Sequence, residues 1–238
     1  MYEIPNITAV ILCGGQGTRL RNVVADRPKS LAEIDGVPFI YLLLNQIKCT
    51  KVHHVLLCTG YLEHMIRDNL GHQYGKLNLE YSTESVPLGT GGALRYALKR
   101  IKTELVLVLN GDSYIEQDFM DYLCWHQRVD AKLSIVLKRV TDTERFGNVS
   151  VSKSGIVTGF SEKTVKGSVP KAGYINAGVY IMGRDAISAI PEGQTFSLER
   201  ELLPSLIGQG VYGYKSQGRF IDIGTPESYR NASAFFAN

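Results

Sequence analysis

The sequence lacks the long apolar segments of membrane-spanning helices. No uninterrupted apolar run approaches the ~18 residues that such a helix needs. The first residues show no basic stretch followed by an apolar core, so we expect no secretory leader. A large excess of one charge is also lacking, since the net charge is +3 over 238 residues. We therefore expect a cytoplasmic protein that binds neither nucleic acid nor membranes.

Cysteine and histidine are sparse and show no metal-binding spacing. The four cysteines form no C-x-x-C pair, so we expect free thiols rather than disulfides or a zinc site. The five histidines are scattered without an H-x-x-x-H pair, and we expect them to be surface or structural residues. These residues are Cys13, Cys49, Cys58, Cys124, His53, His54, His64, His72 and His126.

Apolar runs alternate with helix-period segments through the first half of the chain. Repeated strand-then-helix order predicts a mostly parallel sheet with helices on both faces. The predicted strands cover residues 7–12, 54–59, 77–81 and 105–110, and the predicted helices cover residues 38–49, 63–70 and 92–101.

The second half is less regular and contains no internal repeat or low-complexity linker, which favours one domain. Loop 163–173 carries Gly, Ser, Pro and Lys, and we interpret it as a mobile cover over a site. The predicted strands cover residues 132–139, 148–151, 174–182 and 211–214, and the predicted helices cover residues 197–207 and 226–236.

A glycine-rich turn follows the first strand directly. Gly14, Gly15 and Gly17 leave backbone N–H groups exposed, and such groups bind phosphate oxygens. Arg19 and Lys29 add the positive charge that a triphosphate requires. Ligands of open α/β sheets bind beyond the carboxyl ends of the strands, so the turn predicts a phosphate site there.

Glycines alone do not specify this site. The Gly-Lys-Ser/Thr of the Walker loop is missing, and G-x-G-x-x-G does not fit Gly15, Gly17 and Leu20. A dinucleotide-dependent dehydrogenase would need an acidic residue after the second strand, where residues 58–60 are Cys-Thr-Gly. The plain alternative is a tight strand-to-helix turn, which leaves the nearby Thr-Arg and Pro-Lys pairs without a role.

The chain resembles the sugar-1-phosphate nucleotidyltransferases, also called nucleoside-diphosphate-sugar pyrophosphorylases. The resemblance begins with G-G-x-G-T-R-L at residues 14–20 and Pro-Lys at residues 28–29. It implies a Rossmann-like, GT-A-like α/β fold in a single domain. A nucleotide-binding half would span about 1–130 and a sugar-binding half about 131–238. The further matching segments are 87–93, 110–112, 160–163, 176–178 and 220–226.

The resemblance implies that a nucleoside triphosphate and a sugar 1-phosphate react with release of pyrophosphate. Such transfers depend on positioning and charge neutralisation more than on covalent chemistry. The family places Mg²⁺ on Asp112 and Asp222, and carboxylates suit that ion, although each is alternatively a capping or ion-paired aspartate. Catalytic roles are expected for Arg19, Lys29, Asp112 and Asp222.

The resemblance also assigns binding residues. Glu84 suits the N1–H and N2–H groups of guanine, although it is alternatively an exposed strand residue. Glu199 is either a sugar-site residue or an outer helix carboxylate. Nucleotide contacts are expected from Leu12, Cys13, Gly14, Gly15, Gly17, Thr18, Arg19, Glu84, Pro87, Gly89, Thr90 and Gly111. Sugar-phosphate contacts are expected from Gly147, Asn148, Glu162, Lys163, Asn176, Gly178 and Glu199.

Within the family, the sequence most resembles guanylyltransferases acting on D-glycero-α-D-manno-heptose 1-phosphate. Segments 11–15, 87–92, 145–147 and 220–224 carry this likeness. The implied substrates are GTP and that heptose phosphate, and the implied product is GDP-heptose for bacterial surface glycans. Mannose-, glucose- or N-acetylmuramate-1-phosphate with GTP, CTP or UTP remains an alternative, as does a non-catalytic nucleotide-sugar sensor. A homodimer is compatible with the sequence, but no pattern specifies it.

Overall fold

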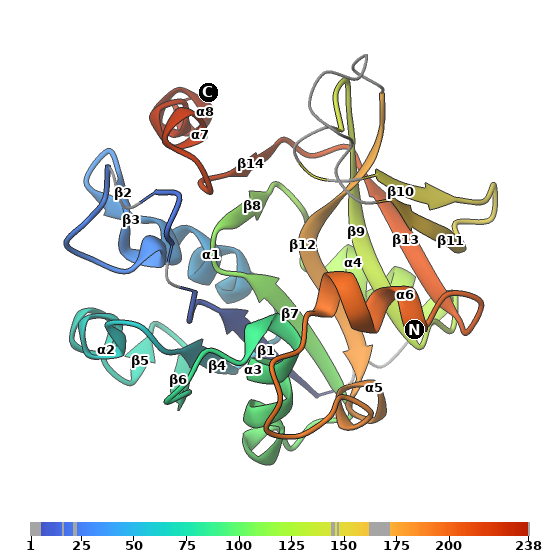
Figure 1. Ribbon diagram of the computed structural model, residues 1–238, viewed down its shortest axis with the longest axis horizontal. Coiled ribbons are helices and arrows are strands. Elements are labelled where there is room, and N and C mark those ends of the chain that lie inside the picture. The colour runs from blue at the N-terminus through green and yellow to red at the C-terminus, as the bar shows by residue number, and fades with distance from the viewer. Residues whose placement is uncertain are drawn as a thin grey trace.

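The computed structural model describes residues 6–15, 17–20, 23–143, 146, 148–161 and 172–237. A central twisted sheet runs through the molecule, as Figure 1 shows. Its first-half strands are β1 (Ile7–Leu12), β4 (His54–Thr59), β5 (Gln73–Tyr74), β6 (Leu77–Thr83) and β7 (Leu105–Asn110). Its second-half strands are β9 (Leu133–Val140), β10 (Asn148–Val151), β11 (Val157–Ser161), β12 (Gly173–Gly183) and β13 (Val211–Ser216).

Strand pairing changes direction between the two halves of this sheet. Among the described residues the strand order is β11-β10-β12-β7-β1-β4-β6-β5, and β9 pairs with both β12 and β13. The run β7-β1-β4-β6 is parallel, as predicted for the first half. Strand β12 joins β7 in the antiparallel sense and opens a mixed second half. The mostly parallel sheet is therefore confirmed, with an antiparallel extension.

Helices cover both faces of the sheet, which confirms the sequence prediction. Along β1, Ile7, Ala9 and Ile11 join one apolar cluster, whereas Val10 joins the other. This alternation is the two-residue period of a strand buried on both sides. The first cluster packs under α1 (Phe39–Lys48), α2 (Glu63–Leu70) and α4 (Phe119–Arg128), and the second under α3 (Gly89–Ala97) and α5 (Arg184–Ser188). No helix of the described residues is long and apolar enough to cross a membrane.

A short antiparallel pair lies beside the main sheet. Strand β14 (Phe220–Asp222) pairs with β8 (Ser113–Ile115), and Asp222 is opposite Ser113. The backbone N–H of Ile223 donates to the carbonyl of Asp112 at 2.9 Å. These contacts bring two distant parts of the chain to the carboxyl end of β7.

The last helices fold back onto the N-terminal half. They are α7 (Pro226–Arg230) and α8 (Ala232–Phe236), and Thr225 with Ser228 forms a capping box at the start of α7. Tyr229 Oη donates to the carbonyl of Glu33 at 2.6 Å. Glu33 belongs to the hairpin of β2 (Glu33–Ile34) and β3 (Val37–Pro38), which follows the 3₁₀ turn η1 (Lys29–Leu31). The C-terminal helices and the hairpin after Lys29 are therefore joined.

Helix α4 was not predicted. Asp118 caps it by accepting hydrogen bonds from the backbone of Met120 and Asp121. Its buried residues Phe119, Tyr122, Leu123 and His126 follow the i, i+3, i+4, i+7 spacing, so the signal was present in the sequence.

Three predicted helix boundaries were wrong. The helix expected at residues 92–101 begins at Gly89 and continues as the 3₁₀ turn η2 (Leu98–Arg100). The helix expected at residues 197–207 is a π turn, η3 (Leu198–Leu202), followed by α6 (Leu203–Ser205). The helix expected at residues 226–236 is split at Asn231. The backbone N–H groups of Gly91 and Gly92 donate to the carbonyl of Phe196, and these tertiary hydrogen bonds start α3 where glycines alone disfavour a helix.

Candidate active site

The glycine-rich turn lies at the carboxyl edge of the parallel strands. Cys13 N donates to Cys58 O at 2.9 Å, and Gly111 N donates to Leu12 O at 2.9 Å, so the three strand ends are joined. Leu20 is 1% exposed and anchors the turn in the core. Gly17 has a φ of +58°, which favours glycine, and a Cβ there would lie 3.3 Å from Lys29 Cβ.

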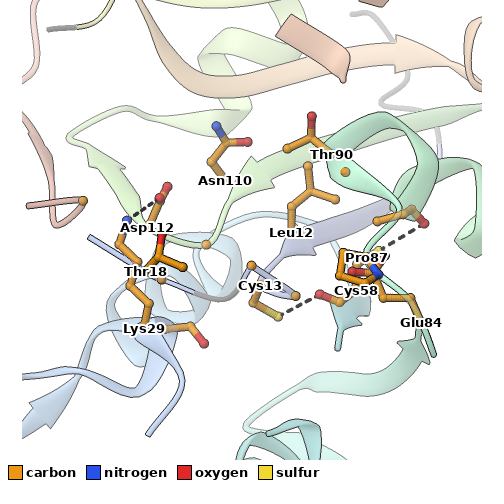
Figure 2. Close-up of a pocket in the computed structure, with 18 of the residues that line it drawn as sticks. Leu12, Cys13, Thr18, Lys29, Cys58, Glu84, Pro87, Thr90, Asn110 and Asp112 are labelled. Carbon is orange, nitrogen blue, oxygen red and sulfur yellow. Dashed lines mark hydrogen bonds and ion pairs between the residues drawn. The ribbon is translucent and has the colours of Figure 1, made fainter. Parts of the chain in front are cut away.

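A cleft of about 330 Å³ opens at this edge. All twelve residues predicted to contact the nucleotide line it, and so do the predicted catalytic residues Lys29 and Asp112. Figure 2 shows Leu12 and Cys13 in the middle of the cleft, with Glu84, Pro87 and Thr90 toward one end and Lys29 and Asp112 toward the other. The lining residues not singled out from the sequence are Ser30, Cys58, Ala93, Asn110 and Gly224.

Glu84 marks the first end of the cleft. Its Oε2 accepts a hydrogen bond from Leu88 N at 3.2 Å. A Cβ on Gly14 would lie 3.1 Å from Glu84 Oε1, and a Cβ on Gly60 would lie 3.1 Å from Glu84 Cγ, so both glycines make room for this side chain. Burial raises the pKa of the Glu84 carboxyl above its ordinary value. A carboxylate in such a half-buried position accepts hydrogen bonds from a ligand at low desolvation cost.

Lys29 and two aspartates mark the second end. Lys29 Nζ forms an ion pair with Asp112 Oδ2 at 2.6 Å, and the lysine side chain is only 12% exposed. Asp222 Oδ1 accepts a hydrogen bond from Gly224 N at 3.0 Å. A Cβ on Gly224 would lie 2.9 Å from Asp222 Oδ2 and 3.2 Å from Lys29 Nζ, so these two groups flank the same point. The ammonium thus pairs directly with Asp112, and Asp222, 110 positions later in the sequence, approaches the same point beside Gly224.

These carboxylates fit a magnesium ion that also binds substrate. No group of three or more His, Cys, Asp or Glu side chains suited to a metal occurs in the described part of the chain. Mg²⁺ bound with nucleotides needs only one or two carboxylates, since phosphate oxygens and waters complete its octahedron. Asp112 lines the cleft, and Asp222 lies opposite Ser113 on the paired strand β14, so the two carboxylates fit that requirement.

The predicted sugar-site residues are only partly gathered. Gly147, Glu162 and Lys163 lie outside the described residues, as does most of loop 163–173. Asn148 begins β10, next to Gly173, and is not part of the cleft lining. Asn176 and Gly178 form a bulge in β12, where Asn176 Oδ1 accepts from Gly178 N at 2.9 Å. Gly178 has a φ of +76° and packs against the Asn110 side chain.

Glu199 joins the two groups of residues. It accepts hydrogen bonds from Thr90, which lines the cleft, and from Tyr180, which lies beyond the β12 bulge. Tyr180 and Asn110 were missed as site residues. Asn110 precedes Gly111 and Asp112 in a matched motif, whereas no sequence signal distinguishes Tyr180 from an ordinary core tyrosine.

The structure confirms what the sequence predicts for the cysteines and for the buried histidine, His126. All four cysteines are free thiols, and Cys13 and Cys58 are buried. Burial raises the pKa of the Cys13 thiol to about 12, so it is protonated and unreactive near neutral pH. His126 is 3% exposed and hydrogen-bonds Ser134 Oγ at 2.7 Å. Burial lowers the His126 pKa to about 4, which makes it a neutral structural residue.

Comparison with known proteins gives consistent matches. A family model described as nucleotidyl transferase matches residues 8–238. The mannose-1-phosphate guanylyltransferase of Mycobacterium tuberculosis (strain ATCC 25618 / H37Rv) is 36% identical over 232 residues, which cover 96% of this chain but 64% of that protein. The D-glycero-alpha-D-manno-heptose 1-phosphate guanylyltransferase of Aneurinibacillus thermoaerophilus is 36% identical over 225 residues, covering 94% of this chain and 96% of that protein.

Solved structures extend the likeness to three dimensions. The crystal structure of HddC from Yersinia pseudotuberculosis superposes with a TM-score of 0.82 at 32% identity, covering 96% of this chain and 99% of that one. The same protein complexed with GMP-PN superposes with a TM-score of 0.81 at 31% identity, with the same coverage. The shared fold therefore includes the edge of the sheet on which the cleft lies.

Proposed function

Because this chain belongs to the nucleotidyl transferase family, we propose that it transfers guanylate from GTP to a sugar 1-phosphate. The favoured acceptor is D-glycero-α-D-manno-heptose 1-phosphate, and the products are GDP-heptose and pyrophosphate. Residues up to about 130 form the nucleotide-binding half in this proposal, and the remainder forms the sugar-binding half.

One observation carries the proposal. A single cleft is lined by a hydrogen-bond-accepting carboxylate, Glu84, toward one end and by Lys29 and Asp112 toward the other (Figure 2). Asp222 is not a lining residue, but it lies next to Gly224, which lines the same end. A nucleoside triphosphate has a matching order of groups, with a base that donates hydrogen bonds at one end and anionic phosphates at the other. The glycine-rich turn lies between them, where backbone N–H groups suit the phosphates.

The chain's own residues supply positioning and charge. Arg19 and Lys29 would hold the triphosphate and neutralise the charge that grows on the α-phosphate as the sugar phosphate oxygen attacks it. Asp112 and Asp222 would hold Mg²⁺, which when bound neutralises phosphate charge that side chains alone leave uncompensated. Glu162 and Lys163, outside the described residues, are proposed to hold the sugar phosphate on grounds of family resemblance.

The base is proposed to be guanine. The carboxylate of Glu84 offers two acceptor oxygens, which match the adjacent N1–H and N2–H donors of guanine. Relatives named as guanylyltransferases support this choice, and so does the HddC structure complexed with GMP-PN.

The sugar is proposed to be a heptose rather than mannose. Identity does not separate the two, since the Mycobacterium and Aneurinibacillus relatives are each 36% identical. The choice of heptose rests on the likeness of segments 11–15, 87–92, 145–147 and 220–224 to the heptose-specific enzymes. Mannose-1-phosphate guanylyl transfer is the second candidate, supported by that equal identity.

A substrate panel tests the proposal. GTP, CTP and UTP are each combined with heptose, mannose, glucose and N-acetylmuramate 1-phosphates in the presence of Mg²⁺, and pyrophosphate release is measured. GTP with the heptose phosphate is expected to give the highest kcat/KM. Turnover of UTP with a hexose phosphate, without turnover of GTP and the heptose phosphate, would overturn the substrate assignment. Absence of pyrophosphate release from every pair would favour a nucleotide-sugar sensor.

A further inference from the structure

Segment 195–199 is fastened to the start of helix α3, where the nucleobase end of the cleft lies. Phe196 N donates to Leu88 O at 2.8 Å, and Gly91 N donates to Phe196 O at 2.8 Å. Leu198 N donates to the hydroxyl of Thr90 at 2.9 Å. Backbone hydrogen bonds in both directions make the segment and the first turn of α3 one rigid unit.

Two glycines permit this close approach. A Cβ on Gly89 would lie 2.7 Å from Phe196 O, and a Cβ on Gly92 would lie 2.6 Å from Gln194 O. Both distances are shorter than a carbon atom tolerates against a carbonyl. A side chain at Gly89 would push Phe196 away, and one at Gly92 would push away Gln194, which directly precedes the segment. The glycines after Pro87 therefore serve the contact with segment 195–199 as well as the cleft.

Glu199 lies at the end of this segment and accepts four hydrogen bonds. Its Oε2 accepts from Thr90 Oγ1 at 2.7 Å and from Ser197 Oγ at 3.2 Å. Its Oε1 accepts from Tyr180 Oη at 3.1 Å and from Asn110 Nδ2 at 3.4 Å. A carboxylate has about four lone-pair sites, so the chain's own donors use the acceptor capacity that a sugar hydroxyl would need.

The Oε1 side of this network continues into the sugar-binding half. Asn176 Nδ2 donates to Tyr180 Oη at 2.7 Å, and Asn176 Oδ1 holds Gly178 N in the β12 bulge. Tyr180 is fully buried, and burial together with the nearby Glu199 charge raises the pKa of its phenol. Tyr180 is therefore a protonated donor, and its hydrogen bond fixes Glu199 relative to β12.

We propose that Glu199 is a positioning residue that ties the nucleobase end of the cleft to the β12 bulge of the sugar-binding half. It acts by holding Thr90 on one side and Tyr180 with Asn110 on the other, rather than by contacting the sugar. The inference rests on the proposed function, because it concerns the same cleft. Its consequence is that removing Glu199 weakens nucleotide binding even when no sugar phosphate is present.

The first test measures the affinity of a non-hydrolysable GTP analogue with Mg²⁺ and without sugar phosphate, by calorimetry. Glu199→Ala is expected to raise the dissociation constant about fivefold or more, the effect of losing one well-placed hydrogen bond. Glu104→Ala is the control, because Glu104 is exposed just before β7, at the opposite end of that strand from Asn110. The control is expected to bind like the wild type. Unchanged affinity in Glu199→Ala, with a raised KM for sugar phosphate alone, would overturn the proposal in favour of direct sugar contact.

A second test uses Tyr180→Phe, which removes one hydroxyl from a residue outside the cleft lining. We expect nucleotide affinity to fall about threefold, and we expect this loss to vanish in the Glu199→Ala background, since both changes act through one carboxylate. Additive effects of Tyr180→Phe and Glu199→Ala would contradict the proposal that Glu199 bridges the base end of the cleft and the β12 bulge. If Glu199→Ala does not fold, Glu199→Gln replaces it. The amide of glutamine has one acceptor oxygen, so it can accept from Tyr180 or from Thr90 but not from both. Its affinity for the GTP analogue should lie between that of the wild type and that of the double variant Tyr180→Phe with Thr90→Val.

The same titrations separate the two proposals. A wild-type protein that binds no nucleoside triphosphate overturns both the proposed function and the bridge. A wild-type protein that binds the GTP analogue, with Glu199→Ala and Tyr180→Phe binding equally well, overturns the bridge alone.

Discussion

Lys29 Nζ lies 2.6 Å from Asp112 Oδ2. The ammonium at this end of the cleft is therefore held by a carboxylate that follows the end of β7. Asp222 Oδ2 and the Lys29 ammonium approach the same point beside Gly224, so the three charged groups lie close together. The ammonium partly compensates two neighbouring carboxylates that would otherwise repel each other. Changes to any member are therefore expected to affect the others.

The charge of Lys29 is expected to be essential for turnover. Lys29→Met keeps most of the aliphatic stem and removes the ammonium, and we expect turnover to fall about 100-fold or more, the usual effect of losing one electrostatic stabiliser. Steady-state pyrophosphate release measures the loss. Lys51→Met, at an exposed position before β4, is the control and should leave turnover unchanged. Turnover of Lys29→Met near the wild-type value would contradict the assignment. Asp112→Ala is expected to lower turnover about as much as Lys29→Met does.

The metal requirement is expected to depend on Asp222. Removing divalent cations with EDTA should abolish turnover, and added Mg²⁺ should restore it. Asp222→Asn retains the hydrogen bond to Gly224 N but weakens the ligand, so we expect half-maximal turnover to require about tenfold more Mg²⁺. A magnesium titration of both proteins gives the answer, and identical titration curves would remove Asp222 from the ligand set.

Glu84 is expected to set the base preference. Glu84→Gln replaces one acceptor with a donor, which mismatches the two donors of guanine but matches the N3–H donor and carbonyl acceptor of uracil. The ratio of kcat/KM for GTP over UTP should fall about tenfold or more. Glu104→Gln, an exposed glutamate before β7, should leave the ratio unchanged. A Glu84→Gln variant with wild-type preference would place the base elsewhere.

His126 is expected to make stability depend on pH. Its pKa is lowered from 6.5 to about 4 in the folded protein. Between these values the unfolded chain binds a proton that the folded chain does not, so the free energy of unfolding falls as the pH falls, by up to about 1.4 kcal/mol per pH unit. Well above pH 6.5 both states hold the histidine neutral, and its contribution to the pH dependence disappears.

Denaturant unfolding from pH 7 to pH 4 tests this dependence. His126→Gln should flatten the decline relative to the wild type, whereas His64→Gln, at an exposed position of α2, should not. Parallel curves for the wild type and His126→Gln would show that the histidine is protonated without cost in the fold.

Gly178 is expected to tolerate no side chain. Its φ of +76° is unfavourable for other residues, and a Cβ would lie 3.0 Å from the Asn110 side chain. Gly178→Ala should therefore lower the free energy of unfolding by about 1–3 kcal/mol. Gly183→Ala is the matched control on the same strand, because its φ is −70° and its Cβ would meet open space. Equal stability of the two variants would remove the strain argument.

The parallel part of the fold was predictable because its signals are local. Buried strands such as β1 appear as continuous apolar runs, and the glycine-rich turn has a recognisable composition. Helix α4 was missed although its spacing was present, and the start of α3 was placed three residues late. The latter error has a physical cause, since the turn at Gly89 is held by Phe196, more than 100 positions away.

The sequence predicts which residues belong to the site better than it predicts which of them contact one another. Residues on the turn after β1 line the cleft as expected, because a strand end and the loop after it stay together. The meeting of Asp112 with Asp222 depends on the pairing of β8 with β14, which no local pattern encodes. The contacts of Glu199 are likewise tertiary, so its sequence neighbours left two roles open.

Because the chain is synthesised from its N-terminus, the packing of α7 and α8 against the N-terminal half has a consequence for the newly made chain. Strands β1, β4, β6 and β7 emerge from the ribosome first and contain the parallel sheet, the glycine-rich turn, Lys29 and Asp112. Asp222 and Tyr229 emerge last, and only then does β14 pair with β8 and Tyr229 reach Glu33. A nascent chain that has not yet reached residue 222 therefore holds Lys29 and Asp112 without Asp222, so the proposed site is completed only late in synthesis.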